Sequence, residues 1–207
     1  MRVLAVADEV AEALYGDTLK DLRPDLILSA GDLPFEYLEN LVSRTDVPLL
    51  YVPGNHDQEL KLGDQTFQGL SANFDGTGPA GCINVDRRIE IAAGLTIAGL
   101  GGSIRYNEGP NQYSQREMRW RAWRLRMRAR LQRKRVDILL THAPPKGYGD
   151  AEDPAHLGVE AWVPLVKELR PRLLIHGHVR NYGPKTADLQ IGDTTIINPI
   201  PYRLIEL

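Results

Sequence analysis

The stretch Pro48-Leu49-Leu50-Tyr51-Val52-Pro53-Gly54-Asn55-His56-Asp57 contains the pattern on which the fold of this chain is decided. Its apolar run has aromatic and β-branched members and predicts a buried strand, and the Pro-Gly pair that follows predicts a turn. The polar side chains of Asn55, His56 and Asp57 then crowd past the carboxyl end of that strand, where open α/β sheets bind their ligands. A polar surface loop is the alternative for this block taken alone.

The chain before this stretch repeats the same pattern twice. Buried strands are predicted at 3–7 and 25–30, a helix of about a dozen residues after the first, and a second helix around 37–42. Strand, helix, strand, helix, strand with short connections predicts a parallel sheet with right-handed crossovers. The first two strands end at Asp8 and Asp32.

The sequence pattern changes after this stretch. Residues 58–81 are polar and are expected to form a loop or lid, and the short runs 83–85, 88–91 and 95–100 predict hairpins of a second, mixed sheet. Two more apolar strands end at His142 and His178, and the tail from 189 to 205 is expected to close the second sheet with hairpins. Without an internal repeat or a linker, we expect an α/β fold in a single domain over residues 1–207.

Composition narrows the class of protein. Of the 207 residues, 43% are hydrophobic and 25% are charged, which is typical of a globular protein. The single cysteine, Cys82, excludes an internal disulfide and a multi-cysteine zinc site, and it favours a reducing compartment. The first residues resemble a strand rather than a leader, and no run of about 18 apolar residues occurs. We therefore expect a cytoplasmic protein without a membrane association.

Residues 105–135 carry an unusual charge. They contain eleven Lys or Arg against two Glu, a balance of +9, which leaves −11 for the rest of a chain whose net charge is −2. A helix is predicted at 113–134, with Trp120, Trp123, Met127 and Leu131 on one face. One interpretation is an anion-binding surface for nucleic acid, acidic lipid or phosphorylated substrates. The other, which we prefer, is a helix that packs through its Trp face on the body or in a homodimer, so that nucleic acid is not the expected partner.

Five apolar strands thus end in side chains that can bind a metal. These side chains are Asp8, Asp32, Asn55 with His56, His142 and His178. A single histidine at a strand end is usually structural, but five such ends together indicate a shared site. Carboxylate, amide oxygen and imidazole suit a divalent transition metal such as Mn, Fe, Zn or Co rather than calcium.

The blocks Asp8, Gly31-Asp32, Gly54-Asn55-His56-Asp57, Thr141-His142 and Gly177-His178, in this order, resemble the calcineurin-like metallophosphoesterase superfamily. The run from Thr141 to Asp150 is most similar to the phosphodiesterase branch near the class III cyclic-nucleotide enzymes. The resemblance implies a four-layer α/β/β/α sandwich, with two mixed sheets flanked by helices and two metals at the strand ends. It also implies that Asp32 bridges the metals, that Asn55, His142 and His178 complete one of them, and that Asp8 serves the other.

The sequence departs from the family pattern at two positions. The family's Asp-x-His motif has Val10 in place of its histidine, and the Gly-His-x-His motif has Arg180 in place of its second histidine. Both losses fall on the metal that Asp8 would serve. We therefore expect one strong metal site and a second that is weak or absent, with the Arg180 guanidinium paired with Asp8.

The chemistry that follows is hydrolysis of a small phosphorylated substrate, most simply a phosphodiester. His56, oriented by Asp57, would assist the leaving group, and Asn55, His56 and Arg180 would bind the phosphate. One alternative is a protein of the same fold that binds a phosphate or nucleotide with little or no turnover. Another is a nucleic-acid-binding protein or nuclease that uses the basic helix 113–134.

Overall fold

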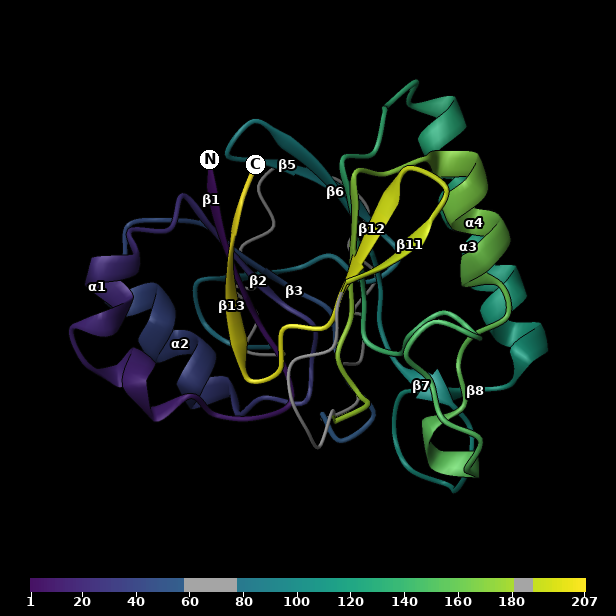
Figure 1. Ribbon diagram of the computed structural model, residues 1–207, viewed down its shortest axis with the longest axis horizontal. Helices are drawn as coiled ribbons and strands as arrows, with labels where there is room; N and C mark the ends of the chain where they lie inside the picture. The colour runs from purple at the N-terminus through teal and green to yellow at the C-terminus, as the bar shows by residue number, and fades with distance from the viewer. Residues whose placement is uncertain (58–77, 181–187) are drawn as a thin grey trace.

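The structure is a computed structural model that describes residues 1–57, 78–180 and 188–207. The loop or lid expected at 58–81 therefore lies almost entirely outside the described residues. Two large mixed sheets face each other and are flanked by helices on their outer sides, which confirms the predicted four-layer sandwich (Figure 1). Among the described residues, no helix is long and apolar enough to span a membrane.

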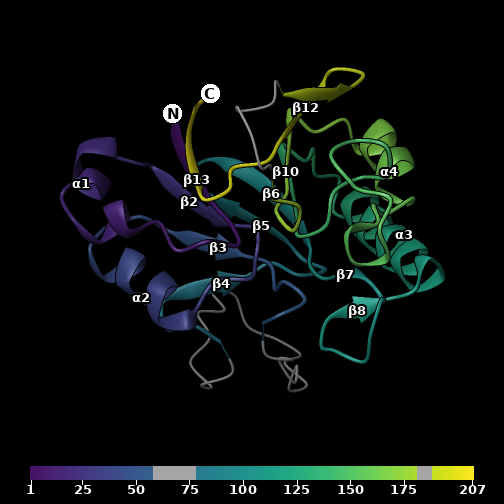
Figure 2. The same ribbon diagram turned by 60° about the horizontal axis from the view of Figure 1, so that its bottom comes forward.

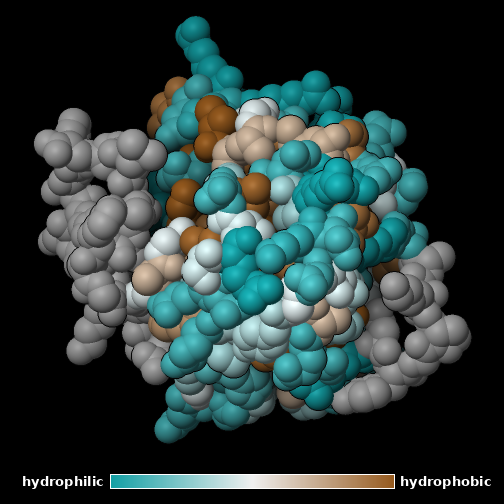
Figure 3. Space-filling model, turned by 90° about the vertical axis from the view of Figure 1, so that its left-hand side faces the viewer, coloured by the Kyte–Doolittle hydropathy of each residue, from teal (hydrophilic) through white to brown (hydrophobic). Residues whose placement is uncertain are grey.

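The first sheet has the strand order β13-β1-β2-β3-β4. Its parallel centre consists of β1, β2 and β3, as the opening pattern predicts. The strands are β1 (Arg2–Val6), β2 (Leu26–Ser29), β3 (Leu49–Tyr51), β4 (Cys82–Asn84) and β13 (Tyr202–Glu206). The outer face of this sheet is covered by α1 (Thr18–Leu22) and α2 (Phe35–Ser43), together with a 3₁₀ turn at Glu12–Tyr15 (Figure 1). The surface on that side mixes hydrophilic side chains with scattered apolar ones (Figure 3).

The second sheet has the order β11-β12-β10-β9-β6-β5. The strands are β5 (Ile89–Ala92), β6 (Leu95–Leu100), β9 (Ile138–Thr141), β10 (Leu173–Ile175), β11 (Leu189–Ile191) and β12 (Thr194–Ile197). Its outer face packs against α3 (Gln115–Leu131) and α4 (Trp162–Leu169). A small ribbon of β7 (Ser103–Ile104) and β8 (Gln112–Tyr113) leads into α3 (Figure 2). A second 3₁₀ turn lies at Pro154–His156.

Alternation along each strand divides the core into three layers. In β1 and the residue after it, Val3, Ala5 and Ala7 enter the layer between the two sheets, and Leu4 and Val6 enter the layer under α1 and α2. This is the period-2 geometry of a strand buried on both faces. It explains why the strands are continuous apolar runs and why their polar residues begin only where each strand ends.

Two strands belong to a different sheet from the one predicted. The run at 82–84 pairs parallel with β3, and the tail strand β13 pairs antiparallel with β1, so both extend the first sheet rather than the second. Each run has a hairpin-like pattern, but local patterns do not specify which sheet edge a strand joins. The pairing also brings the two chain ends together, with the Met1 ammonium donating to the Leu207 carbonyl.

Two of the helix predictions also need correction. The expected helix of a dozen residues after β1 is split into the 3₁₀ turn and the short α1, with Gly16 between them. In α3, the buried apolar side chains are Met118, Ala122, Leu125 and Ala129, whereas Trp120 and Trp123 are exposed. The expectation that the Trp face packs on the body is therefore wrong. Packing selected the smaller apolar stripe on the opposite side of the helix.

Candidate metal centre

The metal-compatible side chains all lie where strands end. Asp8 and Asp32 follow β1 and β2, Asn55 follows β3, and His142 and His178 follow β9 and β10 of the other sheet. Because the central strands of both sheets are parallel, the carboxyl ends of the two sheets meet at one edge of the sandwich. The fold thereby brings together residues up to 170 positions apart in the sequence, since Asp8 accepts a hydrogen bond from the His178 backbone N–H.

Three of these side chains offer ligand atoms to one point in space. One atom each of Asp32, His142 and His178 lies within 4.8 Å of the others. Asn55 Oδ1 lies 2.9 Å from His142 Nε2, and Asp32 Oδ2 lies 3.4 Å from the same nitrogen. Carboxylate, amide oxygen and two imidazoles thus converge, and this donor set fits a borderline divalent metal.

Backbone carbonyls fix both imidazoles. His142 Nδ1 lies 2.7 Å from the Ala30 carbonyl, and His178 Nε2 lies 2.7 Å from the Ala155 carbonyl. A ring nitrogen in that position donates its proton to the carbonyl, which leaves the lone pair on the opposite nitrogen for an ion. Metal-binding histidines commonly have this second contact, so the geometry around the rings also fits a metal.

Electrostatics hold the site together in the absence of an ion. Burial alone would lower the pKa of His142, but the charge and hydrogen bond of Asp32 raise it to about 9. Burial would likewise raise the pKa of Asp32, and His142 lowers it to about 2. Burial lowers the pKa of His178 to about 3, with the positive charge of His142 adding to the effect. At neutral pH His142 and Asp32 form a buried ion pair, in which a metal would replace the His142 proton.

Glycines in the motifs allow the strand ends to approach each other. A Cβ on Gly54 would lie 2.0 Å from Asp32 Oδ1, and a Cβ on Gly177 would lie 2.1 Å from Asp8 Oδ2. Gly31 has a φ of +97°, and its Cβ would meet the backbone nitrogen of Gly54 at 2.5 Å. A side chain at Gly54 or Gly177 would displace a carboxylate of the site, and one at Gly31 would displace the turn at Gly54.

Asp8 and Arg180 lie next to the triad. Both Asp8 oxygens accept from the His178 N–H, at 3.0 and 2.9 Å. Burial raises the pKa of Asp8 to about 6, against the lowering effects of His142 and that N–H. The guanidinium of Arg180 also lowers the pKa of Asp8, but the ion pair that the structure shows for it is with Glu9, at 3.2 Å, and not with the Asp8 we predicted. Val10 packs against the apolar core under α1 and α2.

His56 and Asp57 lie in the bend that follows β3. His56 is exposed at the mouth of the site, and its backbone N–H donates to Asp32 Oδ1 at 2.8 Å. Asp57 Oδ2 accepts from the backbone N–H groups of Asp32, at 3.0 Å, and Gly54, at 2.7 Å. The contacts of Asp57 Oδ2 are therefore with the backbone of the metal-binding turns, and burial raises the pKa of this carboxyl.

The structure adds residues that the sequence pattern did not reveal. The Tyr106 hydroxyl accepts from Asn55 Nδ2 at 3.1 Å, which turns the amide oxygen of Asn55 toward His142. Asn111 donates to the carbonyls of Gly54 and Asp57 and so fixes the turn from a distant loop. Neither residue belongs to a recognisable motif, and only the tertiary fold brings them to the site.

His156 and Asp153 are the other unexpected residues. They form a pair with 2.9 Å between His156 Nδ1 and Asp153 Oδ1, and the His156 ring centroid lies 5.5 Å from that of His178. A cleft of about 620 Å³ opens above the triad. Its lining includes Asp8, Asp32, His56, Tyr106, Asp153, His156, His178 and Arg180. This volume is sufficient for a small substrate.

Comparison with known proteins agrees with this geometry. The model of the calcineurin-like phosphoesterase family matches residues 3–182, and the chain belongs to that family. Members of the family depend on metals, and membership together with the triad supports hydrolysis of phosphoester bonds. No curated protein matches the chain.

Solved structures show the same fold at low identity. One crystal structure has a TM-score of 0.69 at 19% identity and covers 99% of this chain and 94% of its own. The TT1561 protein of Thermus thermophilus has a TM-score of 0.64 at 21% identity, over 96% of this chain and 88% of that one. A putative 5'-nucleotidase from Staphylococcus aureus has a TM-score of 0.54 at 9% identity, over 96% of this chain and 48% of that one. These similarities concern the fold alone.

Proposed function

We propose that the protein is a metal-dependent phosphodiesterase, of the branch that resembles class III cyclic-nucleotide phosphodiesterases, and that it works with one tightly bound divalent ion. The observation that carries this proposal is the convergence of Asp32, His142 and His178, with Asn55 beside them, at the floor of a substrate-sized cleft. A bound ion would lower the pKa of its bound water to about 7 and hold a phosphoryl oxygen. The ion is one of Mn, Fe, Zn or Co, for which this mixture of ligands is suited.

The second ion of the family is absent in this proposal. Asp8 accepts from the His178 backbone, Val10 packs against the core, and Arg180 pairs with Glu9, so few donors remain for a second ion. In place of a second ion, the Arg180 guanidinium offers a fixed positive charge and forked hydrogen-bond donors to a phosphate in the cleft. His56 at the mouth of the cleft donates a proton or hydrogen bond to the leaving oxygen. Asn55 contributes through its amide oxygen, since its nitrogen is engaged by Tyr106.

The charge of the cleft supports a diester substrate. Its lining includes Asp8, Asp32 and Asp153, and the pKa of Asp153 is lowered by its hydrogen bond to His156. A phosphodiester carries one negative charge, whereas a monoester carries close to two at neutral pH. With one ion rather than two, repulsion from these carboxylates penalises the dianion more strongly.

The test combines metal analysis with two substrates. We expect about one divalent ion per chain, and faster hydrolysis of bis-p-nitrophenyl phosphate than of p-nitrophenyl phosphate. His142→Ala should lose both the ion and the activity, whereas Ile138→Val in the same strand β9 should retain both and control for a mild loss of packing. Full metal occupancy and an unchanged rate in His142→Ala would refute the site. A metal-loaded protein that hydrolyses neither ester would instead be a phosphate-binding protein of this fold.

A further inference from the structure

Helix α3 presents an aromatic surface to solvent. Trp120 is 57% exposed and Trp123 is 42% exposed, and their rings stack with centroids 4.6 Å apart and planes 12° from parallel. The helix does not need these rings for its own stability, because its opposite side is buried in the core and Ser114 and Glu117 form a capping box at its start. Two exposed, stacked indoles are unusual on a surface without a ligand or partner.

Five of the seven arginines of α3 fall into two groups. Arg121 donates to Asp86 at 2.7 Å and Arg126 to Glu168 at 2.8 Å, and these tie the helix to the body. Arg116, Arg119 and Arg124 are exposed, and none of them forms an ion pair with a residue that the structure describes. At a rise of 1.5 Å per residue, positions 116 to 124 extend over about 12 Å of helix. The helix therefore carries positively charged side chains in addition to the arginines that attach it to the body.

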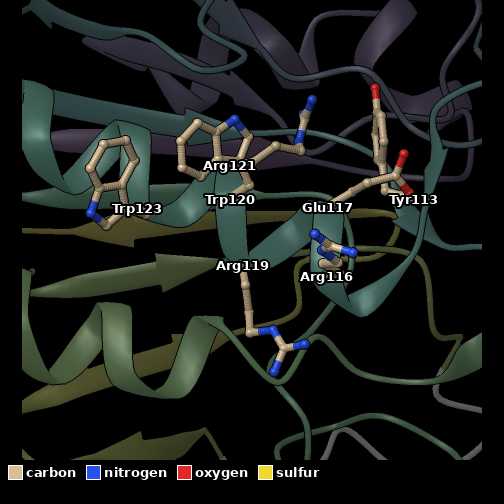
Figure 4. Close-up of a pocket in the computed structure, with 7 residues that line it drawn as sticks. All are labelled: Tyr113, Arg116, Glu117, Arg119, Trp120, Arg121 and Trp123. Carbon is tan, nitrogen blue, oxygen red and sulfur yellow. The ribbon is translucent and has the colours of Figure 1, made fainter.

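The same surface is hollowed. A pocket of about 640 Å³ is lined by Tyr113, Trp120 and Trp123, with Arg116, Arg119, Arg121 and the single acidic residue Glu117 around it. Figure 4 shows the two indole rings next to each other on one side, Tyr113 on the other, and the arginine side chains extending from the same helix. The Arg121 guanidinium lies 4.1 Å over the Tyr113 ring. This surface, which we call the Trp–Arg surface, is separate from the cleft, and the two share no lining residue.

The charge and shape of the Trp–Arg surface indicate which kind of ligand it binds. A symmetric dimer through α3 would bring two segments of charge +9 together, so a second copy is disfavoured by repulsion. A bilayer accepts protruding apolar groups, whereas here the rings border a hollow. Flat aromatic faces beside unpaired guanidinium groups bind single-stranded nucleic acid, since bases stack on the rings and phosphates meet the arginines.

We propose that the Trp–Arg surface of α3 binds single-stranded nucleic acid, with one or more bases stacked on the indoles of Trp120 and Trp123. The row of arginines, about 12 Å long, favours a strand over a single nucleotide. The proposal is independent of the hydrolysis assigned to the cleft, because it uses a different surface and requires no metal. It also reverses the preference drawn from the sequence, in which these rings were expected to be covered.

The experiment measures the anisotropy of a fluorescent oligothymidylate titrated with the full chain in the presence of EDTA. We expect binding that weakens with salt, with a log–log slope of about −2 for three phosphate contacts. Each of Trp120→Ala and Trp123→Ala should weaken binding on the order of tenfold. Arg119→Glu with Arg124→Glu should abolish it, whereas Lys20→Glu with Lys167→Glu, an equal charge change at exposed sites on α1 and α4, should have little effect. All four proteins should hydrolyse bis-p-nitrophenyl phosphate at the rate of the parent.

Three results would overturn the proposal. The first is the absence of oligonucleotide binding at low salt. The second is binding that is equal in the parent and the Trp120→Ala protein, which would place the strand elsewhere, for example in the cleft. The third is stronger binding to phosphatidylserine vesicles or self-association that requires the same residues, which would assign the surface to a membrane or to a second copy.

Discussion

Replacing Gly54 by Ala tests how closely the metal site depends on the approach of two strand ends. The new Cβ would lie 2.0 Å from Asp32 Oδ1 and 2.6 Å from the Asp32 nitrogen. Non-bonded heavy atoms prefer about 3.5–4.0 Å, so Asp32 or the turn must move by at least about 1 Å. The φ of Gly54 is not positive, so the alanine backbone itself is not strained and the effect is one of contact.

A shift of this size acts directly on the triad. Asp32 Oδ2 lies 3.4 Å from His142 Nε2, and a carboxylate displaced by about 1 Å would no longer share an ion with that ring. Misplacement by about 1 Å costs roughly 10²-fold in an enzyme site. We expect Gly54→Ala to lose about 10²-fold in metal affinity and at least as much in the rate of diester hydrolysis, and to remain folded.

The assay is metal titration by calorimetry, alongside circular dichroism and turnover of bis-p-nitrophenyl phosphate. Gly16→Ala is the matched control, because its Cβ meets only the Ala13 carbonyl at 3.6 Å, an ordinary contact. It should bind metal and turn over like the parent. If Gly54→Ala binds the ion with unchanged affinity, Asp32 is not held where the structure places it, and the reasoning from the glycine is refuted.

Three further predictions concern the same site. His56→Ala should keep the metal and lower kcat by roughly 10²–10⁴, and a loss of metal instead would make His56 a ligand. Asp8→Ala should weaken metal binding by about 10–100-fold, because it frees the backbone of His178, and Asp8→Asn, which keeps an acceptor oxygen, should lose less. Equal metal affinities for the two variants would contradict this role. Asp32 holds the pKa of His142 at about 9, above its ordinary 6.5, so their ion pair stabilises the metal-free protein fully below pH 6.5 and is lost as the pH rises through 9. The Tm of the metal-free protein should therefore fall between about pH 7 and 10 more than that of the metal-loaded protein, and parallel curves would show that this pair does not form.

The sequence predicted the fold well because the signals were strong and local. Strands buried on both faces are continuous apolar runs, and they end abruptly at polar residues, so their positions and the chemistry at their ends could be read directly. The sequence did not predict the sheet to which β4 and β13 belong, because both are short edge runs whose partners are far away in the sequence. An edge strand is specified by what it pairs with, and one-dimensional periodicity does not record this.

Helix α3 shows the limit of periodicity in another way. Trp120 and Trp123 define one apolar face, and Met118 and Leu125 belong to another on the opposite side. The pattern favoured the larger side chains, but the layer above the second sheet accommodates Met118, Leu125 and small alanines between α3 and the strands. Which of two apolar faces is buried depends on the space that the neighbouring layer leaves, and that is a property of the assembled core.

The gathering of the metal-compatible side chains at the strand ends could be predicted from the sequence, but not the way in which they depend on one another. Asp8, Asp32 and His178 all have positive φ angles, at 59°, 57° and 70°. For a residue with a side chain, this backbone conformation costs about 1–3 kcal/mol. Hydrogen bonds between the turns offset this cost. Asp57 accepts from the Asp32 N–H, and Asp8 accepts from the His178 N–H.

These bonds give Asp8 a role that requires no second ion. Both Asp8 carboxylate oxygens accept from the backbone N–H of His178 and so hold this strained residue in place. That support for His178 is needed even when the site binds only one metal. The presence of Asp8 is therefore no evidence for a two-metal site in this chain. The residues that bear on the second ion are Val10, which packs against the core, and Arg180, which is paired with Glu9. Neither side chain offers a donor to a metal.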